Sequence, residues 1–429
     1  MKKIFVVIML SMLSSPLLMA QEAKADLKTL INRSFTYFPK FKELSQAVES
    51  DQLRIELAKS AGLPSVSASG SYRYAAPVSE ISLPGGNGIQ IVPKNNYATS
   101  IDAQYTLLDF GVVKAGVDRA KAALQYSKDN IEVNRNQVAY EVAGIYYQIA
   151  YLKKAIAIQD SVINFLQVNK KDTEIKFKNG DALRYDVLTI LSSIHKEENS
   201  KIDLLNALDK QYALMEYSSG LKTDIANIEV GFPLENASDL YSALAKAQAE
   251  NPEFKLLNDR VAQLQADLAL SKTGGKPTIS LSAGNGFRNG FAPDIMQFRY
   301  NYAAGLSVRI PIYDGGKARK QVRLSQSELK TTQFSAESLN NSFRRDIDRA
   351  LIDVKSNTSS LANSGQQIAE AKEAQKLAQS RFRNGIGTNL ELTEASSNVQ
   401  RAELADLQFR YKLCVAQLTL AKLTGLKYW

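Results

Sequence analysis

The sequence predicts a mainly helical protein with a small antiparallel sheet, arranged as two copies of one pattern. Three observations support this prediction. Two long stretches, Gly116 to Gly180 and Gly316 to Gly385, contain no proline and are rich in good helix formers. Four shorter segments alternate apolar and polar residues with the period of two that is typical of strands. Prolines, aspartates and glycines recur at a nearly constant offset, which indicates an internal repeat.

Residues 1–20 form a predicted signal peptide. Lys2 and Lys3 precede the apolar run Ile4–Leu10, and Ala20 offers a small residue where cleavage is expected. A charged start, a short apolar run and a small-residue cleavage site are typical of secretory signals. The run is short for a transmembrane helix, and no later stretch reaches the roughly 18 apolar residues that such a helix needs. We therefore expect an exported mature chain.

The repeat organises the mature chain. Pro39 and Pro64 correspond to Pro252 and Pro277, and the prolines of each pair are 25 positions apart. The later landmarks, the Asp109/Asp314 and Gly180/Gly385 pairs, are 205 residues apart. We expect a first repeat at 21–217, a linker at 218–238 and a second repeat at 239–429, each with a helix, two strands and a long helical hairpin.

The strands are predicted at about 64–75, 96–108, 277–287 and 298–312. Each has one face of small polar residues and one apolar face. The residues that we expect to face lipid are Tyr72, Tyr97, Ile101, Tyr105, Tyr302, Leu306 and Val308. Strands of about ten residues cross a bilayer when tilted, and tyrosines near their ends suit the aromatic girdles of membrane barrels.

Taken alone, this alternation favours a soluble antiparallel sheet with one hydrated face. The export signal favours a membrane location instead. Four strands in lipid would leave unpaired edges, which the bilayer does not tolerate. If the sheet lies in a membrane, several chains must therefore share one barrel, and three chains would supply twelve strands.

The long helical stretches are predicted to fold back as antiparallel hairpins at the two Asn-Gly pairs, near 179–180 and 384–385. A helix of about 60 residues spans about 90 Å, far more than a bilayer. Helices of this length need a bundle or a coiled coil for stability. Helix content alone fits a coiled-coil scaffold without a lumen equally well.

Several function classes are not expected. The net charge of +9 is spread along the chain with acids between the basic residues, and no nucleic-acid-binding motif is present, so no nucleic acid partner is predicted. His195 is the single histidine and Cys414 the single cysteine. No zinc-binding cluster, phosphate loop or catalytic-serine motif occurs. We predict no enzyme activity, no cofactor and no metal site.

These features resemble the TolC family of outer-membrane efflux proteins over essentially the whole mature chain. The resemblance is carried by the two-copy layout, by "FPKFK" and "NPEFK", by "PIYDGGKARK" and by "RFRNGIGTNLELTEA". It implies a homotrimer in the outer membrane of a Gram-negative bacterium, with four strands per protomer in a twelve-stranded barrel and coiled helices that form a periplasmic α-barrel. It also implies an exit duct of a tripartite efflux or type I secretion system.

The resemblance further implies partners and site residues. The partners are outer-membrane lipid, a periplasmic adaptor (membrane fusion) protein and an inner-membrane pump of the resistance-nodulation-division or ABC type. Glu391 and Glu394, with Asp186 in the first copy, are expected to line the periplasmic entrance, where three copies would form carboxylate rings that favour cations. The expected adaptor-docking residues at the helix tips are Asn179, Gly180, Asp181, Asn384 and Gly385.

One pair of residues departs from the family pattern. Some members hold the entrance shut with a tyrosine and an arginine, but Phe382 and Gly387 stand at those places here. We therefore expect different closing contacts. A soluble periplasmic coiled-coil adaptor or scaffold is the alternative function, and the tyrosine-rich strands favour the duct over it.

Overall fold

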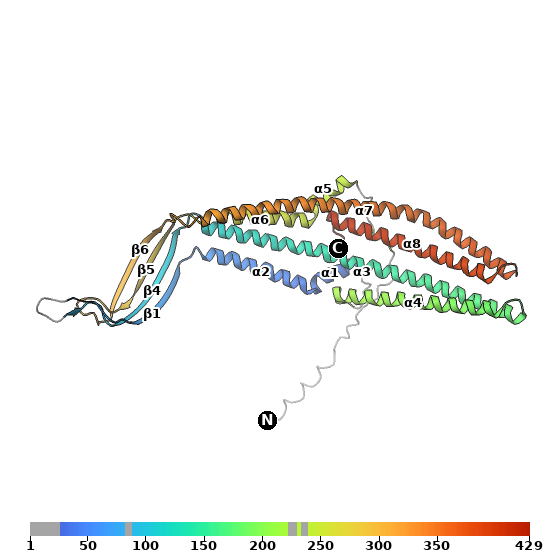
Figure 1. The fold of residues 1–429 in the computed structure, drawn as a ribbon, viewed down its shortest axis with the longest axis horizontal. Helices are drawn as coiled ribbons and strands as arrows, with labels where there is room; N and C mark the ends of the chain where they lie inside the picture. The colour runs from blue at the N-terminus through green and yellow to red at the C-terminus, as the bar shows by residue number, and fades with distance from the viewer. Residues whose placement is uncertain (1–25, 82–87, 222–229, 233–238) are drawn as a thin grey trace, which may run out of the picture. The chain divides into compact units, whose positions relative to one another are not determined.

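The computed structural model describes residues 26–81, 88–221, 230–232 and 239–429 (Figure 1). The predicted signal peptide and most of the predicted linker lie outside the described residues. Within the described ranges, no helix combines the length and the hydropathy that a bilayer-spanning helix requires.

The chain divides into two compact units, and each draws on both copies of the repeat. The hairpin unit consists of Met1–Lys42, Val133–Asn251 and Ser342–Trp429. The sheet unit consists of Glu43–Glu132 and Pro252–Asn341. The repeat in sequence therefore does not correspond to two separate domains in space.

A four-stranded antiparallel sheet lies in the sheet unit, as the fold class predicted. Its strands are β1 (Ser65–Tyr74), β4 (Asn95–Leu108), β5 (Thr278–Arg288) and β6 (Arg299–Arg309), in the order β1-β4-β5-β6. The central β4–β5 pairing joins the two copies of the repeat. A two-stranded ribbon of β2 (Glu80–Ile81) and β3 (Ile89–Gln90) lies in the β1–β4 connection.

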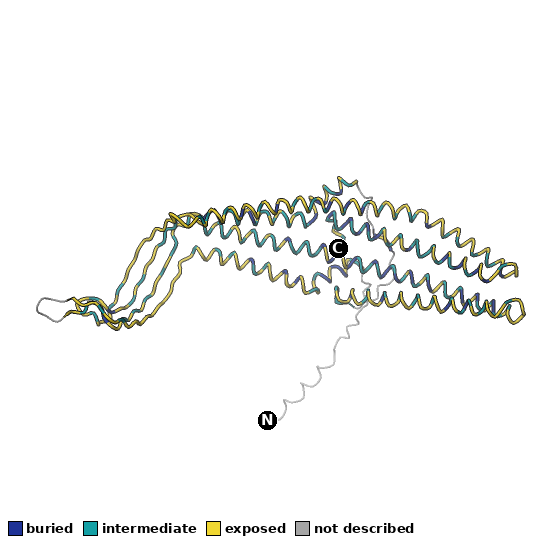
Figure 2. The backbone as a smooth tube through the Cα atoms, in the orientation of Figure 1, coloured by how far each residue is buried: buried dark blue, intermediate teal, exposed yellow. Residues whose placement is uncertain are grey.

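The strand register keeps the two faces chemically distinct. On the apolar face, Tyr72 pairs with Tyr97 and their ring centroids lie 5.2 Å apart. On the polar face, the Ser69 and Ser100 hydroxyls hydrogen-bond at 2.9 Å. Every residue of the four strands is exposed or only half-buried in the single chain (Figure 2). The other residues that the structure describes therefore leave the apolar face of the sheet uncovered.

Two long helical hairpins account for about half of the chain. The first consists of α3 (Val112–Asn179) and α4 (Arg184–Ser219), and the second of α7 (Lys317–Arg383) and α8 (Asn389–Thr424). The junction from β6 into α7 is capped by Asp314, whose Oδ2 accepts the Ala318 N–H at 2.8 Å. That bond lowers the pKa of the Asp314 carboxyl from its ordinary value. The equivalent Asp109 caps α3 through the Val113 N–H at 2.6 Å.

Each copy also contributes two short helices. These are α1 (Leu27–Tyr37) and α2 (Pro39–Ser60) in the first copy, and α5 (Leu240–Glu250) and α6 (Pro252–Ser271) in the second. Pro39 and Pro252 occupy the first helical position, where a missing N–H costs nothing. Inside the hairpin unit, α3 and α8 pack through Ala143, Tyr147, Cys414 and Leu418, all 5% exposed or less. This core anchors the bases of both hairpins.

Candidate functional site at the helical turns and the sheet

Both helical hairpins turn at a glycine in the left-handed region. Gly180 has a φ of +85° and Gly385 has a φ of +75°. Beyond them, the Asp181 N–H donates to the Lys176 carbonyl at 2.8 Å, and the Ile386 N–H donates to the Arg381 carbonyl at 3.1 Å. A glycine after the last helical turn satisfies these carbonyls without the steric cost of a Cβ.

The five predicted docking residues lie at these two turns, and all five are exposed. The structure adds a feature that the sequence prediction missed. Large apolar side chains beside the turns are also exposed: Leu183, Tyr185, Ile386 and Leu390 are between 68% and 74% accessible. Exposed apolar residues clustered at a helical tip are typical of a protein-binding surface. Their position immediately after each Asn-Gly pair was the available signal in the sequence.

The predicted entrance carboxylates have partners. Glu391 lies 3.6 Å from the Arg381 Nε, and Glu394 lies 2.8 Å from an Arg401 guanidinium nitrogen. Asp186 Oδ2 accepts the Leu183 N–H at 3.0 Å and so caps α4. Both glutamates and both arginines are more than 45% exposed, so solvent screens these ion pairs strongly. The two arginines largely balance the formal charge of the two glutamates.

Phe382 lies in a contact between the two hairpins of the hairpin unit. The Lys176 ammonium donates to the Phe382 carbonyl and lies 4.1 Å from the centroid of its ring. The Phe382 side chain is buried, at 6% exposed. A Cβ added to Gly387 would lie only 2.9 Å from the Arg381 Cβ. The turn is therefore too tight at Gly387 for any side chain.

Asn389 extends this contact. Its Oδ1 accepts from Asn169 Nδ2 at 3.0 Å, and its Nδ2 lies 3.5 Å from the Asp186 carbonyl, so one side chain joins α8 to α3 and α4. Farther from the turns, Gln159 Nε2 donates to the Glu197 carboxylate at 2.7 Å. Gln400 Nε2 donates to the same carboxylate at 2.9 Å. Two polar clusters thus hold the hairpins together within one chain.

The strand residues predicted to face lipid share the apolar face of the sheet. Six of the seven are at least 50% exposed, and Tyr302 reaches 79%. Tyr105 is half-buried and pairs with Leu281. A contiguous exposed apolar face of this kind is typical of a surface that contacts another protein or a membrane.

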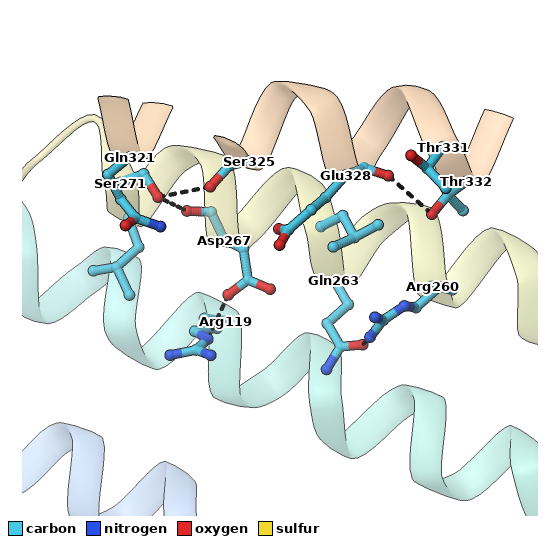
Figure 3. A pocket seen from close by; sticks show the side chains of 12 residues that line it. Arg119, Arg260, Gln263, Asp267, Ser271, Gln321, Ser325, Glu328, Thr331 and Thr332 are labelled. Carbon is cyan, nitrogen blue, oxygen red and sulfur yellow. Dashed lines mark hydrogen bonds and ion pairs between the residues drawn. The ribbon is translucent and has the colours of Figure 1, made fainter. Parts of the chain in front are cut away.

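A polar pocket of about 750 Å³ lies in the sheet unit among α3, α6 and α7 (Figure 3). Its side chains are engaged with one another. Arg119 pairs with Asp267 at 2.5 Å, and the Ser271 and Ser325 hydroxyls lie 2.9 Å apart. Among the residues that the structure describes, no three His, Cys, Asp or Glu side chains are grouped to hold a metal. The pocket is accounted for by polar helix packing.

His195 and Cys414 occupy unrelated positions. His195 is exposed on α4. Cys414 is 1% exposed in the hairpin core, and burial raises the pKa of its thiol to about 12. The thiol is therefore held in its unreactive protonated form.

Comparison with known proteins identifies the family. The model of the family described as "Outer membrane efflux protein" matches residues 30–219 and 243–426. The chain belongs to the outer membrane efflux protein family. It is 22% identical over 395 residues to the outer membrane protein TolC of Escherichia coli, covering 87% of this chain and 76% of that protein. It is 21% identical over 379 residues to the outer membrane efflux protein BepC of Brucella suis, covering 86% and 79%.

Solved structures agree on the fold. The CmeC outer membrane channel of Campylobacter jejuni matches with a TM-score of 0.78 at 16% identity, over 93% of this chain and 85% of that one. The resemblance to the TolC family and the predicted mixture of long helices and a small sheet are confirmed. Family membership places the chain in the Gram-negative outer membrane, extending into the periplasm. It also favours an efflux channel over a soluble adaptor.

Proposed function

We propose that three copies of this chain form a passive exit duct, in which the shared sheets close a twelve-stranded barrel in the outer membrane. The observation that carries this proposal is the sheet itself. It has one exposed apolar face, and its outer strands β1 and β6 have a strand partner on one side only. In lipid, each unpaired backbone group costs several kcal/mol, so β6 of one copy must pair with β1 of the next.

The hairpins would then supply the periplasmic part of the duct. Each protomer contributes two tips, and the exposed residues at each tip suit docking by a periplasmic adaptor. The adaptor would link the duct to an inner-membrane pump of the resistance-nodulation-division or ABC type. The apolar side chains Leu183, Tyr185, Ile386 and Leu390 would supply most of the binding free energy, because they are large, exposed and close to the turns.

We also propose that Glu391, Glu394 and Asp186 line the entrance, with a cation preference moderated by Arg381 and Arg401. The Lys176–Phe382 contact and the Asn389 cluster would keep the entrance narrow. They hold the two hairpins of one protomer together, so a widening that separated those hairpins would have to break them.

The experiment that tests the duct is native mass spectrometry of protein extracted from outer membranes, combined with single-channel recording in planar bilayers. We expect a trimer and a discrete conductance. A water-soluble monomer released by osmotic shock, with no conductance, would refute the proposal and support the adaptor alternative.

A further inference from the structure

Three arginines gather on the polar face of the sheet at its loop end, away from the helices. We propose that Arg73, Arg288 and Arg299 form a binding site for phosphate-bearing anions. We call this group the arginine collar. Its place at the mouth of the duct rests on the proposed function, because the polar face lines a lumen only if the sheets close into a barrel.

The register places the collar on one face. Arg288 of β5 is directly opposite Arg299 of β6. Arg288 also pairs with Ala98 of β4, and Arg73 of β1 pairs with Asn96, which is two residues from Ala98. Directly paired residues, and residues two apart on a strand, project from the same face. All three guanidinium groups therefore belong to the polar face.

The charge of the collar is not neutralised within the chain. In the ranges that the structure describes, none of the three arginines forms an ion pair. Arg299 donates to neutral acceptors, the Gln297 side chain at 2.7 Å and the Ala292 carbonyl at 3.2 Å. The guanidinium carbon of Arg288 lies 4.6 Å from the centroid of the Phe291 ring. These contacts orient two of the guanidinium groups without cancelling their charge.

No described acidic residue forms an ion pair with the collar, and Glu80 of the β2–β3 ribbon accepts the Gln90 side-chain amide at 3.4 Å. The one acid among the residues of β1, β4, β5 and β6 is Asp102, which pairs with Gly284, four residues from Arg288. Four residues along a strand amount to about 13 Å, too far for an ion pair. Asp102 also accepts the Ser100 hydroxyl at 2.6 Å. In the loop, Asp294 accepts the Met296 N–H at 3.0 Å.

Several neighbouring positions on the polar face carry only small side chains. Ala98, Gly284, Gly286 and Ala303 lie on the same face and carry a methyl group or nothing. At Gly286 a Cβ would fall 1.9 Å from the Thr99 carbonyl oxygen, so no larger residue fits there. The larger residues on this face at that level are Asn96, opposite Arg73, and Asn301, opposite Gly286. Their side-chain amides donate to the backbone carbonyls of Arg73 and Gly286, and both side chains are neutral.

The chemistry of the collar selects the ligand. Like charges directly opposite on neighbouring strands repel, and a multivalent anion between them would remove the repulsion. The planar guanidinium fork binds oxyanions through two parallel hydrogen bonds and prefers phosphate or carboxylate. Because the apolar face is the one that meets lipid, the collar on the opposite face fits a soluble phosphate-bearing solute better than a lipid headgroup.

Equilibrium binding of pyrophosphate to the full-length protein in a neutral detergent tests the proposal. The double variant Arg288→Gln/Arg299→Gln removes the repelling pair, so it should fold at least as well as the wild type. Arg309→Gln is the matched control, since Arg309 lies on the same face at the opposite end of β6, where it pairs with Thr278. We expect the double variant to bind about tenfold more weakly or worse, and the control to bind like the wild type.

Each outcome has a defined meaning. Equal pyrophosphate affinity in the double variant and the wild type would overturn the collar. So would retention of the wild-type protein on phosphatidylglycerol vesicles but not phosphatidylcholine vesicles, if pyrophosphate does not bind, because the site would then be a lipid site. Planar-bilayer recording separates the two proposals. Pyrophosphate binding without any conductance would refute the proposed duct and support the anion site. Conductance without pyrophosphate binding would support the duct and refute the anion site.

Discussion

Two adjacent alanines in the middle of β6 offer a direct test of which face of the sheet meets lipid. Ala303 pairs with Gly284 on the polar face, and Ala304 pairs with Ala283 on the apolar face. Both are exposed in the single chain. The variants Ala303→Lys and Ala304→Lys therefore make the same chemical change one residue apart. They differ only in the face that receives the charge.

The expected loss of stability follows from the depth of Ala304 in the bilayer. The 11 residues of β6 span about 36 Å, or about 25 Å across a bilayer at the usual tilt, with Ala304 at the centre. A lysine facing lipid at the midplane of a barrel costs about 2–4 kcal/mol, and three copies in a trimer would raise this to about 6–12 kcal/mol. The lysine of the Ala303→Lys variant would instead face the lumen, across from Gly284 and near Asp102, where water and a carboxylate favour its charge.

The assay is assembly of each variant into outer membranes, followed by thermal dissociation of the extracted trimer. Ala304→Lys should assemble poorly and dissociate at a markedly lower temperature, whereas Ala303→Lys should behave like the wild type. Equal behaviour of the two variants would refute the assignment of the faces. A stronger defect in Ala303→Lys would mean that the polar face, and not the apolar face, contacts lipid.

Three further predictions concern the helices. Lys176→Met removes a charged hydrogen bond and a cation–π contact that together contribute about 2 kcal/mol. The single-channel open probability of this variant should therefore rise. Lys178→Met changes an exposed lysine nearby and should leave the open probability unchanged. Replacing both Glu391 and Glu394 with glutamine leaves the positive charges of Arg381 and Arg401 without their acidic partners. The reversal potential in a KCl gradient should therefore move towards anion preference. An unchanged reversal potential would contradict the proposed role of the two glutamates in lining the entrance. Burial, together with the neighbouring Asp129, raises the pKa of Asp259 to about 6. The folded state therefore binds an extra proton, and this contribution to stability is lost as the pH rises from about 4 to about 6. In Asp259→Asn the melting temperature should change less over that window, and an identical pH profile would count against the shift.

Local patterns were sufficient for the fold class. Period-two alternation identifies strands, and register then keeps residues such as Tyr72 and Tyr97 on one face whatever their partners are. Long runs of helix-forming residues identify helices, because each turn depends on near neighbours. The sequence also contains two signals that the prediction did not use. One is the group of apolar residues beside the Asn-Gly turns, and the other is Arg401, which lies two turns after Glu394 on α8.

Contacts between distant segments depended on packing. Lys176 and Phe382 are 206 residues apart, and nothing in either local pattern indicates that these two residues are in contact. The pairing of β4 with β5 brings residues of the two copies together across a similar separation, and the collar exists only in that register. A pattern in sequence reports which face a residue occupies. Which other face it meets is decided by the free energy of the whole packed arrangement, and that requires the tertiary structure.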